Sequence, residues 1–423
     1  MTKFTDDKYW IHKALQAWDE DDDDAGLLDI FRLAKLNKHE ELSRLLSEKP
    51  ELVHIVNPLG DTLLHVACNS DAPNTASLLL RCGAEPNTRV SNMPPLHVSV
   101  KRNSIECTQL LLYRGADINA LGGYGVRPLH YAVRKRPKAN GDIFKFLIDA
   151  GASIETRSKT QKTVLHHFSC QETAAFGIDV LRERLKLILD VGDCGLLEAR
   201  DDCGRTPILE AIQSKNHIAL RVLLEAGAQT NIVDFNGFNI LETAANWGTV
   251  EVLEVLKEAQ ITGVDSRTTG ANGDRMSPVD RFAWQLALHP LYHNGKSAGP
   301  DIRCVKAFEE LLRDIRDRAI STEIMKLEDI ISKIKAGDLV PVKEELVQLT
   351  ESKLEARINW EAETFRAVEL DVRSGRTDLA IESLHEFMEE SRKRLDVSPY
   401  DEEGGGLYEK IKRSWEYLGL TVE

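Results

Sequence analysis

The strongest constraint on this chain is a short sequence box that returns at a nearly constant interval. Each box has a Leu-His pair, preceded by Thr or Pro and followed two places later by a small residue, and a Gly-Ala pair comes about twenty residues later. The boxes span 62–67, 94–99 and 127–132, and the Gly-Ala pairs stand at 83–84, 115–116 and 151–152. A chain with one internal period folds as stacked copies of one supersecondary unit. We therefore expect a repeat architecture rather than one compact core.

The histidine position of the box defines the period. It falls at residues 65, 97, 130 and 166, which are His, and then at Leu209, Glu242 and Asp280. Two longer steps predict insertions near 171–180 and 286–300. The unit reads as two helices: prolines such as Pro128 suit a helix start, and glycines such as Gly83 suit the left-handed residue that ends a helix. One such pair cannot bury its own apolar face, so neighbouring pairs must stack.

These boxes resemble the ankyrin-repeat family, whose unit is a β-turn and two helices in about 33 residues. The resemblance covers roughly residues 27 to 318. It implies an all-α curved solenoid with finger turns. It also implies that the repeated histidine is structural and hydrogen-bonds between adjacent turns, so we do not interpret the four histidines as metal ligands.

Three regions follow from the pattern. Residues 1–25 end in the acidic run 19–24, which repels itself and predicts a flexible acidic arm. Residues 26–318 predict an N-terminal capping unit followed by about seven repeats. In residues 319–423 the boxes are absent, and apolar residues from Ile320 to Ile334 recur every three or four places, which predicts an α-helical extension. Its role stays open between capping the solenoid, dimerisation and a second partner.

Composition narrows the setting. No run of 18 apolar residues predicts a membrane span, and the first residues lack the apolar segment of a signal peptide. The seven cysteines are odd in number and form no Cys-x-x-Cys pair, which favours a reduced, intracellular protein. We expect it in the cytoplasm. The basic string 134–138 leaves a nuclear location open, although it spans the junction of two predicted helices.

No group of residues in the sequence predicts catalysis. His289 and His293 have a zinc-like spacing, but Pro290 lies between them. The glycines at 122–125 lack the Lys-Ser/Thr ending of a phosphate loop, and Cys170 lies near His166 as a repeat residue would. We therefore predict a non-enzymatic protein with no cofactor and no metal. The oligomeric state is not indicated.

The charge distribution points to a binding surface. The chain has a net charge of −14, yet residues 81–162 hold 14 Lys and Arg against 6 Asp and Glu, a local net of +8. In ankyrin-like stacks the positions four and five places after the histidine lie on the concave face. Two consecutive repeats place cation pairs there, and nearby finger residues add three more. This basic surface comprises Arg89, Lys101, Arg102, Arg134, Lys135, Lys159 and Lys162. The alternative is a solvated face that happens to be basic.

Aromatic residues mark a second place. Phe235 and Phe238 lie on a predicted finger and Trp247 on the adjoining helix. Solvent-facing aromatic residues are enriched in binding hot spots, although packing on the next, irregular unit also explains them.

The sequence thus predicts a protein-interaction scaffold or adaptor that holds an acidic or phosphorylated segment of a partner protein on its concave face. Arg and Lys donate charge-assisted hydrogen bonds to such groups. The alternative is a nucleic-acid-associated regulatory factor that uses the stripe of residues 81–162. The acidic remainder of the chain and the lack of basic motifs studded with aromatics count against it.

Overall fold

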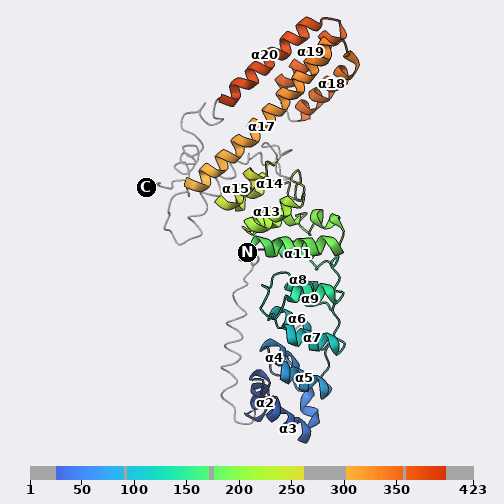
Figure 1. The fold of residues 1–423 in the computed structure, drawn as a ribbon, viewed down its shortest axis with the longest axis vertical. Coiled ribbons are helices and arrows are strands. Elements are labelled where there is room, and N and C mark those ends of the chain that lie inside the picture. Colours follow the sequence, from blue (N-terminus) through green and yellow to red (C-terminus); the bar gives the residue numbers. More distant parts are fainter. Residues whose placement is uncertain (1–24, 90–92, 171–175, 262–301, 356–358, 397–423) are drawn as a thin grey trace. The chain divides into compact units, whose positions relative to one another are not determined.

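The computed structural model describes residues 25–89, 93–170, 176–261, 302–355 and 359–396 (Figure 1). The chain divides into two compact units, residues 1–168 with 179–196 and residues 169–178 with 197–423. The described residues are helical, with isolated β-bridges and no strand, which confirms the all-α prediction. Most of the predicted arm, the last repeat box around Asp280, the insertion at 286–300 and the end of the chain lie outside the described residues.

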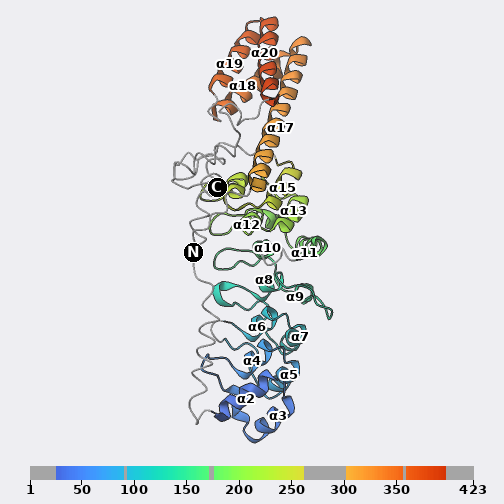
Figure 2. The ribbon, with the colours of Figure 1, turned by 90° about the vertical axis from the view of Figure 1, so that its left-hand side faces the viewer.

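The first unit is built from pairs of helices, an inner and an outer one in each repeat. In Figure 2 the inner helices form one layer, the outer helices form a second, and the loops that join the repeats lie on the side of the inner layer. The inner helices are α2 (Ala25–Lys35), α4 (Leu63–Asn69), α6 (Pro95–Lys101), α8 (Pro128–Ala132) and α10 (Val164–Phe168). The outer helices are α3 (His39–Glu48), α5 (Pro73–Arg81), α7 (Ile105–Tyr113), α9 (Ile143–Asp149) and α11 (Ile178–Val191). Short 3-10 helices are η1 (Pro50–His54), η2 (Gly123–Gly125) and η4 (Cys194–Glu198).

Left-handed residues end the helices of each repeat. The outer helices are followed by glycines with positive φ, as predicted, at Gly83, Gly115 and Gly151. The turns from inner to outer helix use Asn37, Asp71 and Asn103, with φ of 56°, 54° and 59°. Asn and Asp tolerate this conformation better than most residues. The sequence therefore carries a second periodic signal, 34 and 32 residues apart, beside the histidine box.

The repeats are joined by a continuous apolar core and by polar bonds between neighbours. Leu63, Leu79 and Leu111 are fully buried in one cluster that runs through the first repeats. At the inter-helix turns, the Asn37 side chain accepts the Thr75 N–H at 3.0 Å, and the Asn103 amide donates to the Arg136 carbonyl at 2.9 Å. Each repeat is thus held by its neighbour, as stacking requires.

The second unit combines repeats with the helical extension. Its repeat helices are α12 (Pro207–Gln213), α13 (His217–Glu225), α14 (Ile240–Trp247) and α15 (Val250–Glu258). The extension consists of α17 (Ile302–Lys335), α18 (Leu339–Glu355), α19 (Asn359–Arg373) and α20 (Thr377–Asp396). The beginning of α17 packs on α15, where Lys257 pairs with Glu310 at 2.6 Å. The expected boundary between residues 318 and 319 lies inside α17.

Candidate interaction surface

The finger turns share one hydrogen-bond design. The first residue of each finger accepts, on its side chain, the backbone N–H four residues later. These bonds join Asn57 with Asp61 (2.7 Å), Ser158 with Lys162 (3.1 Å), Asp201 with Arg205 (2.9 Å) and Asp234 with Phe238 (2.8 Å). Fingers also touch their neighbours, since the Lys159 N–H donates to the Tyr124 carbonyl at 2.9 Å. The finger residues are therefore held in fixed positions.

The repeated histidines tie each repeat to the next finger. Nε2 of His65, His97 and His130 lies 3.1, 3.0 and 3.1 Å from the carbonyl oxygens of Met93, Val126 and Thr156. Burial lowers the pKa of His97 and of His130 to about 4, so both rings are neutral at pH 7 and donate through Nε2. A Cβ at Gly122 would come within 2.7 Å of the His97 ring, which explains a glycine there. The structural role implied by the family resemblance is confirmed.

Two cations of the basic surface lie at the end of α6. Lys101 is its last residue and Arg102 follows it, and both side chains are exposed. Arg102 Nε donates to Asn69 Oδ1 at 2.6 Å. Asn69 is four places after His65, and Arg102 is five places after His97. Side chains at these positions of successive repeats are therefore neighbours, as the register predicts.

Two more cations follow α8. Arg134 and Lys135 are half-buried, and the Arg134 guanidinium lies over the Tyr131 ring, 5.6 Å from its centre. The loop that carries them is braced from behind by Arg184 of α11. This fully buried guanidinium donates to the carbonyls of Val133 and Lys135 and, at 3.0 Å, to Asp142 Oδ1.

Sequence reasoning missed Arg184, because its partners lie more than 40 residues away along the chain. The available signal was an arginine in the middle of an otherwise amphipathic helix.

The remaining cations come from the fingers. Arg89 and Lys159 are exposed and Lys162 is half-buried. Burial is the main cause of the lowered pKa of His97, and Arg89 lowers it further. The pKa of His167 falls well below its usual value through burial and, in part, through the charges of Arg134 and Lys162. Cations from an inner helix and a finger therefore act on the same inner-layer histidine.

The charges of the basic surface are not cancelled internally at four of its residues. Within the described residues, Arg89, Lys101, Arg102 and Lys159 form no ion pair with a carboxylate. The nearest contrast in the same segment is Lys138, whose Nζ lies 3.9 Å from Asp71. These four cations are available to an external anionic group.

The aromatic residues lie in the second unit, whereas the basic surface lies in the first. Phe235 at a fingertip is 66% exposed, and its backbone N–H donates to the Cys203 carbonyl at 3.0 Å. Trp247 ends α14 and is 46% exposed, and Phe238 is half-buried. Phe235 packs so closely over Gly204 that a Cβ there would meet its ring at 2.5 Å. Phe235 and Trp247 are thus presented to solvent.

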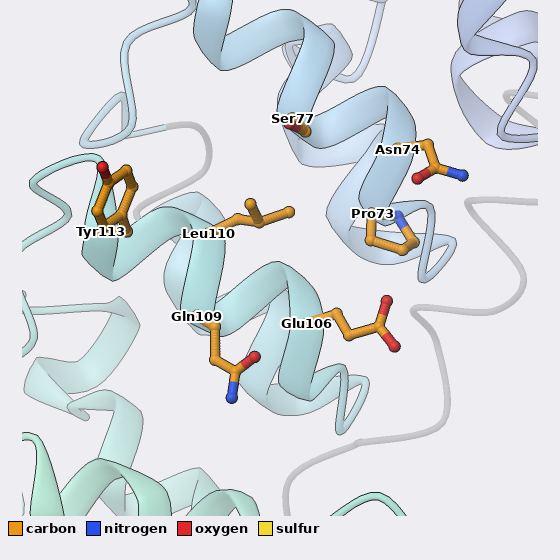
Figure 3. Close-up of a pocket in the computed structure, with 7 residues that line it drawn as sticks. All are labelled: Pro73, Asn74, Ser77, Glu106, Gln109, Leu110 and Tyr113. Carbon is orange, nitrogen blue, oxygen red and sulfur yellow. The ribbon is translucent and has the colours of Figure 1, made fainter.

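A shallow groove of about 420 Å³ lies on the outer layer between α5 and α7 (Figure 3). Its lining is mixed, with apolar Leu110, the 85% exposed Tyr113 and the carboxylate of Glu106 among its residues. It contains no residue of the basic surface and no nucleophile paired with a base.

The other candidates carry no chemistry either. Asp201, Asp202 and Cys203 cluster on a finger. However, both carboxylate oxygens of Asp201 accept hydrogen bonds, Oδ2 from Arg205 Nη2 at 2.7 Å and Oδ1 from the Cys203 and Arg205 N–H groups. His289 and His293 lie outside the described residues. No described helix has the length and apolar character needed to cross a membrane.

Comparisons with known proteins agree with this geometry. A family model for ankyrin repeats in three copies matches residues 30–122 and 91–158. Human transient receptor potential cation channel subfamily A member 1 is 27% identical over 251 residues, which is 56% of this chain and 21% of the channel. The mouse B-cell lymphoma 3 protein homolog is 26% identical over 235 residues, 52% of this chain and 48% of that protein.

Two further matches are a yeast protein and a solved structure. The probable 26S proteasome regulatory subunit p28 of Saccharomyces cerevisiae is 27% identical over 223 residues, 50% of this chain and 90% of the subunit. The crystal structure of the human ASB11 ankyrin repeat domain is 21% identical, with a TM-score of 0.45, over 53% of this chain and 96% of that one. The chain spans about a fifth of the channel and about half of the mouse protein.

Proposed function

Because this chain contains ankyrin repeats, we propose that it is a non-enzymatic scaffold or adaptor that holds a partner protein on its inner-helix and finger face. Ankyrin repeats generally mediate protein–protein interaction. The partner contributes an acidic or phosphorylated segment, which the basic surface of the first unit binds. The hydrogen bond between Arg102 and Asn69 carries this proposal, because it supports the register that aligns the cations of successive repeats.

The chemistry of the surface favours an extended anionic ligand. Arg102 on one repeat and Arg134 on the next bracket a stretch of the inner layer, and Arg89 and Lys159 approach from the fingers. Guanidinium groups bind carboxylate and phosphate through paired hydrogen bonds. Their hydrogen bonds to Asn69 and to the Tyr131 face hold the arginines without neutralising them. The ligand supplies the negative charge.

The aromatic residues of the second unit extend the proposal. Phe235, Phe238 and Trp247 serve as apolar anchors for a second stretch of the same partner. Large aromatic side chains bury much area at little conformational cost, which is why they dominate binding hot spots.

The proposed location is the cytoplasm, with a nuclear fraction allowed by the basic string 134–138. The described cysteines are all free thiols, as expected in a reducing compartment.

Charge reversal tests the proposal. The double variant Arg102→Glu/Lys135→Glu should bind a fluorescent peptide of twelve glutamates, or a phosphoserine peptide of the same length, at least about tenfold more weakly at low salt. Fluorescence anisotropy gives the affinity and thermal melting gives the stability. The matched control is Arg114→Glu/Lys145→Glu, which makes the same charge change at exposed positions at or next to outer helices. Equal loss in both double variants, or no loss in either, would refute a localised site.

The same basic surface supports the alternative, a nucleic-acid-associated factor. An oligonucleotide should then bind more tightly than the acidic peptides at equal salt, with an affinity that falls steeply as salt rises. The net charge of −14 opposes this outcome. A pull-down with and without nuclease separates the two functions, since a protein partner survives the nuclease.

A further inference from the structure

The helical extension repeats its own burial pattern after 38 residues. From residue 322 to residue 354, nearly every position has the same exposure class as the position 38 places later. The paired buried residues are Ile324 and Ala362, Leu327 and Phe365, Ile330 and Val368, Ile334 and Val372, Val342 and Ala380, and Leu346 and Leu384. The two segments therefore bury the same faces.

The turns of the two segments agree as well. Gly337 joins α17 to α18 with φ of 78°, and Gly375 joins α19 to α20 with φ of 77°. Both glycines follow a buried residue by three places and precede the next buried residue by five. Only six of the 35 pairs between 320–354 and 358–392 are identical, so the sequence alone hides the relation.

The packing of the four helices has the symmetry that two like hairpins require. α18 packs on α19, and α17 packs on α20, which are equivalent contacts when the two hairpins are exchanged (Figure 1). All four helices contribute to one apolar cluster, and every member of it lies between residues 320 and 388. An αα-hairpin buries one face, and two hairpins can cover each other's faces.

We propose that residues 320–392 are one 38-residue helical hairpin used twice, that each copy is the docking partner of the other, and that Lys353 positions the two copies. Lys353 Nζ lies 2.5 Å from Glu323 and 2.6 Å from Glu361. These two glutamates are 38 residues apart and occupy the same place in the two copies. All three side chains are largely buried. Lys353 thus joins the equivalent carboxylates across the boundary between the copies.

The position equivalent to Lys353 in the second copy is Ser391, which is 3% exposed. Its neighbour Arg392 pairs with Glu328 of α17 at 2.9 Å, so the end of α20 runs beside the part of α17 that bears Glu323. Symmetry therefore directs residue 391 toward the same two glutamates from the other side. One lysine for two carboxylates leaves room for a second cation there.

This arrangement assigns two roles to α17. Its first half packs on α15 through buried residues such as Val305 and Phe308, and so covers the end of the repeats. Its second half belongs to the duplicated bundle. Because the bundle closes on itself, its apolar faces are satisfied within one chain and need no second copy of the chain.

The test is a rescue by symmetry in the full-length chain. Lys353→Ser should leave two buried carboxylates unpaired, and amide hydrogen exchange in α17–α20 should accelerate at least about tenfold. Adding Ser391→Lys to that variant should restore slow exchange, because the lysine reaches the same glutamates from the equivalent place. Ser391→Lys alone should keep the bundle folded. Binding of the acidic peptide to the basic surface should stay unchanged in all three variants, so the outcome is independent of the proposed function.

A matched control uses the same substitution at another place on α20. Ser383→Lys, combined with Lys353→Ser, puts a lysine two turns away from residue 391 and should not rescue. Equal rescue by residues 383 and 391 would show that only net charge matters and would overturn the symmetry. Failure of residue 391 to rescue, or unfolding of the bundle by Ser391→Lys alone, would overturn it as well.

Discussion

The repeats of the first unit and the bundle of the extension treat their cations in opposite ways. In the bundle, Lys333 pairs with Asp329 and Glu345, and Lys353 pairs with Glu323 and Glu361. In the first unit, Arg89, Lys101 and Lys159 have no acidic partner within the described residues. A region that neutralises its own charges has little electrostatic reason to bind an anion. A region that leaves them open does.

The two regions are also held together differently. Polar groups link neighbouring repeats, for example His97 to the Val126 carbonyl, beside a thin apolar core. The bundle relies on one closed apolar cluster with Phe365 and Leu384 fully buried. Damage to the repeats should therefore spread along the stack and respond to acid, whereas damage to the bundle should stay inside it.

The largest expected effect is an interior break in the stack. Leu129→Asp puts a charge at a position that is 2% exposed in α8, and it should destabilise the first unit by roughly 5 kcal/mol. Urea unfolding followed by hydrogen exchange of repeat peptides measures it. Glu155→Ala, at an exposed position of the same unit, should change little. Equal melting temperatures for the two variants would contradict the repeat register.

A cavity in the bundle should be nearly as costly but confined. Phe365→Ala removes a fully buried ring from α19, and it should destabilise the bundle by about 3–5 kcal/mol. Hydrogen exchange should accelerate in α17–α20 and stay slow in α4–α9. Acceleration in both regions would show that the bundle and the repeats unfold together, against the contrast drawn here.

Acid should weaken the repeats through their histidines. The pKa of His97 is about 4 in the folded state against 6.5 ordinarily, so the unfolded state binds the proton more readily. The stabilisation is complete above pH 6.5 and declines as the pH falls toward 4. It amounts to a loss of about 2 kcal/mol at pH 5 from this residue. His97→Gln keeps a donor for the Val126 carbonyl but does not titrate.

Urea titrations at pH 7 and pH 5 separate this term from other acid effects. The drop in unfolding free energy between the two pH values should be smaller in His97→Gln than in the unaltered protein. An identical drop in both would mean that the His97 ring is not held neutral by the fold.

The smallest effects come from the same substitution in the two regions. Arg392→Met in the bundle removes exposed pairs with Glu328 and Glu389, and it should lower stability by less than about 1 kcal/mol with peptide binding intact. Arg102→Met in the repeats should keep the melting temperature and weaken binding of the acidic peptide. Calorimetry and anisotropy on both variants check this crossing of effects. Loss of binding in Arg392→Met would place the anion site in the wrong region.

The sequence by itself determined the repeat fold and the structural histidines. The box and the glycines after the outer helices are local requirements, since a finger turn and a left-handed helix end each need particular residues at fixed places. Such signals survive in one sequence without any tertiary information. The inter-helix Asn37, Asp71 and Asn103 belong to the same class of signal.

Only the tertiary structure decided what crosses repeats and hairpins. The brace of Arg184 under Lys135, the division of the cations and the aromatics between two units, and the bridge of Lys353 join residues that no local rule relates. The duplication of the hairpin is hidden for a similar reason. Packing constrains which faces are apolar but accepts many apolar residues, so the burial pattern persists after the residue identities have changed.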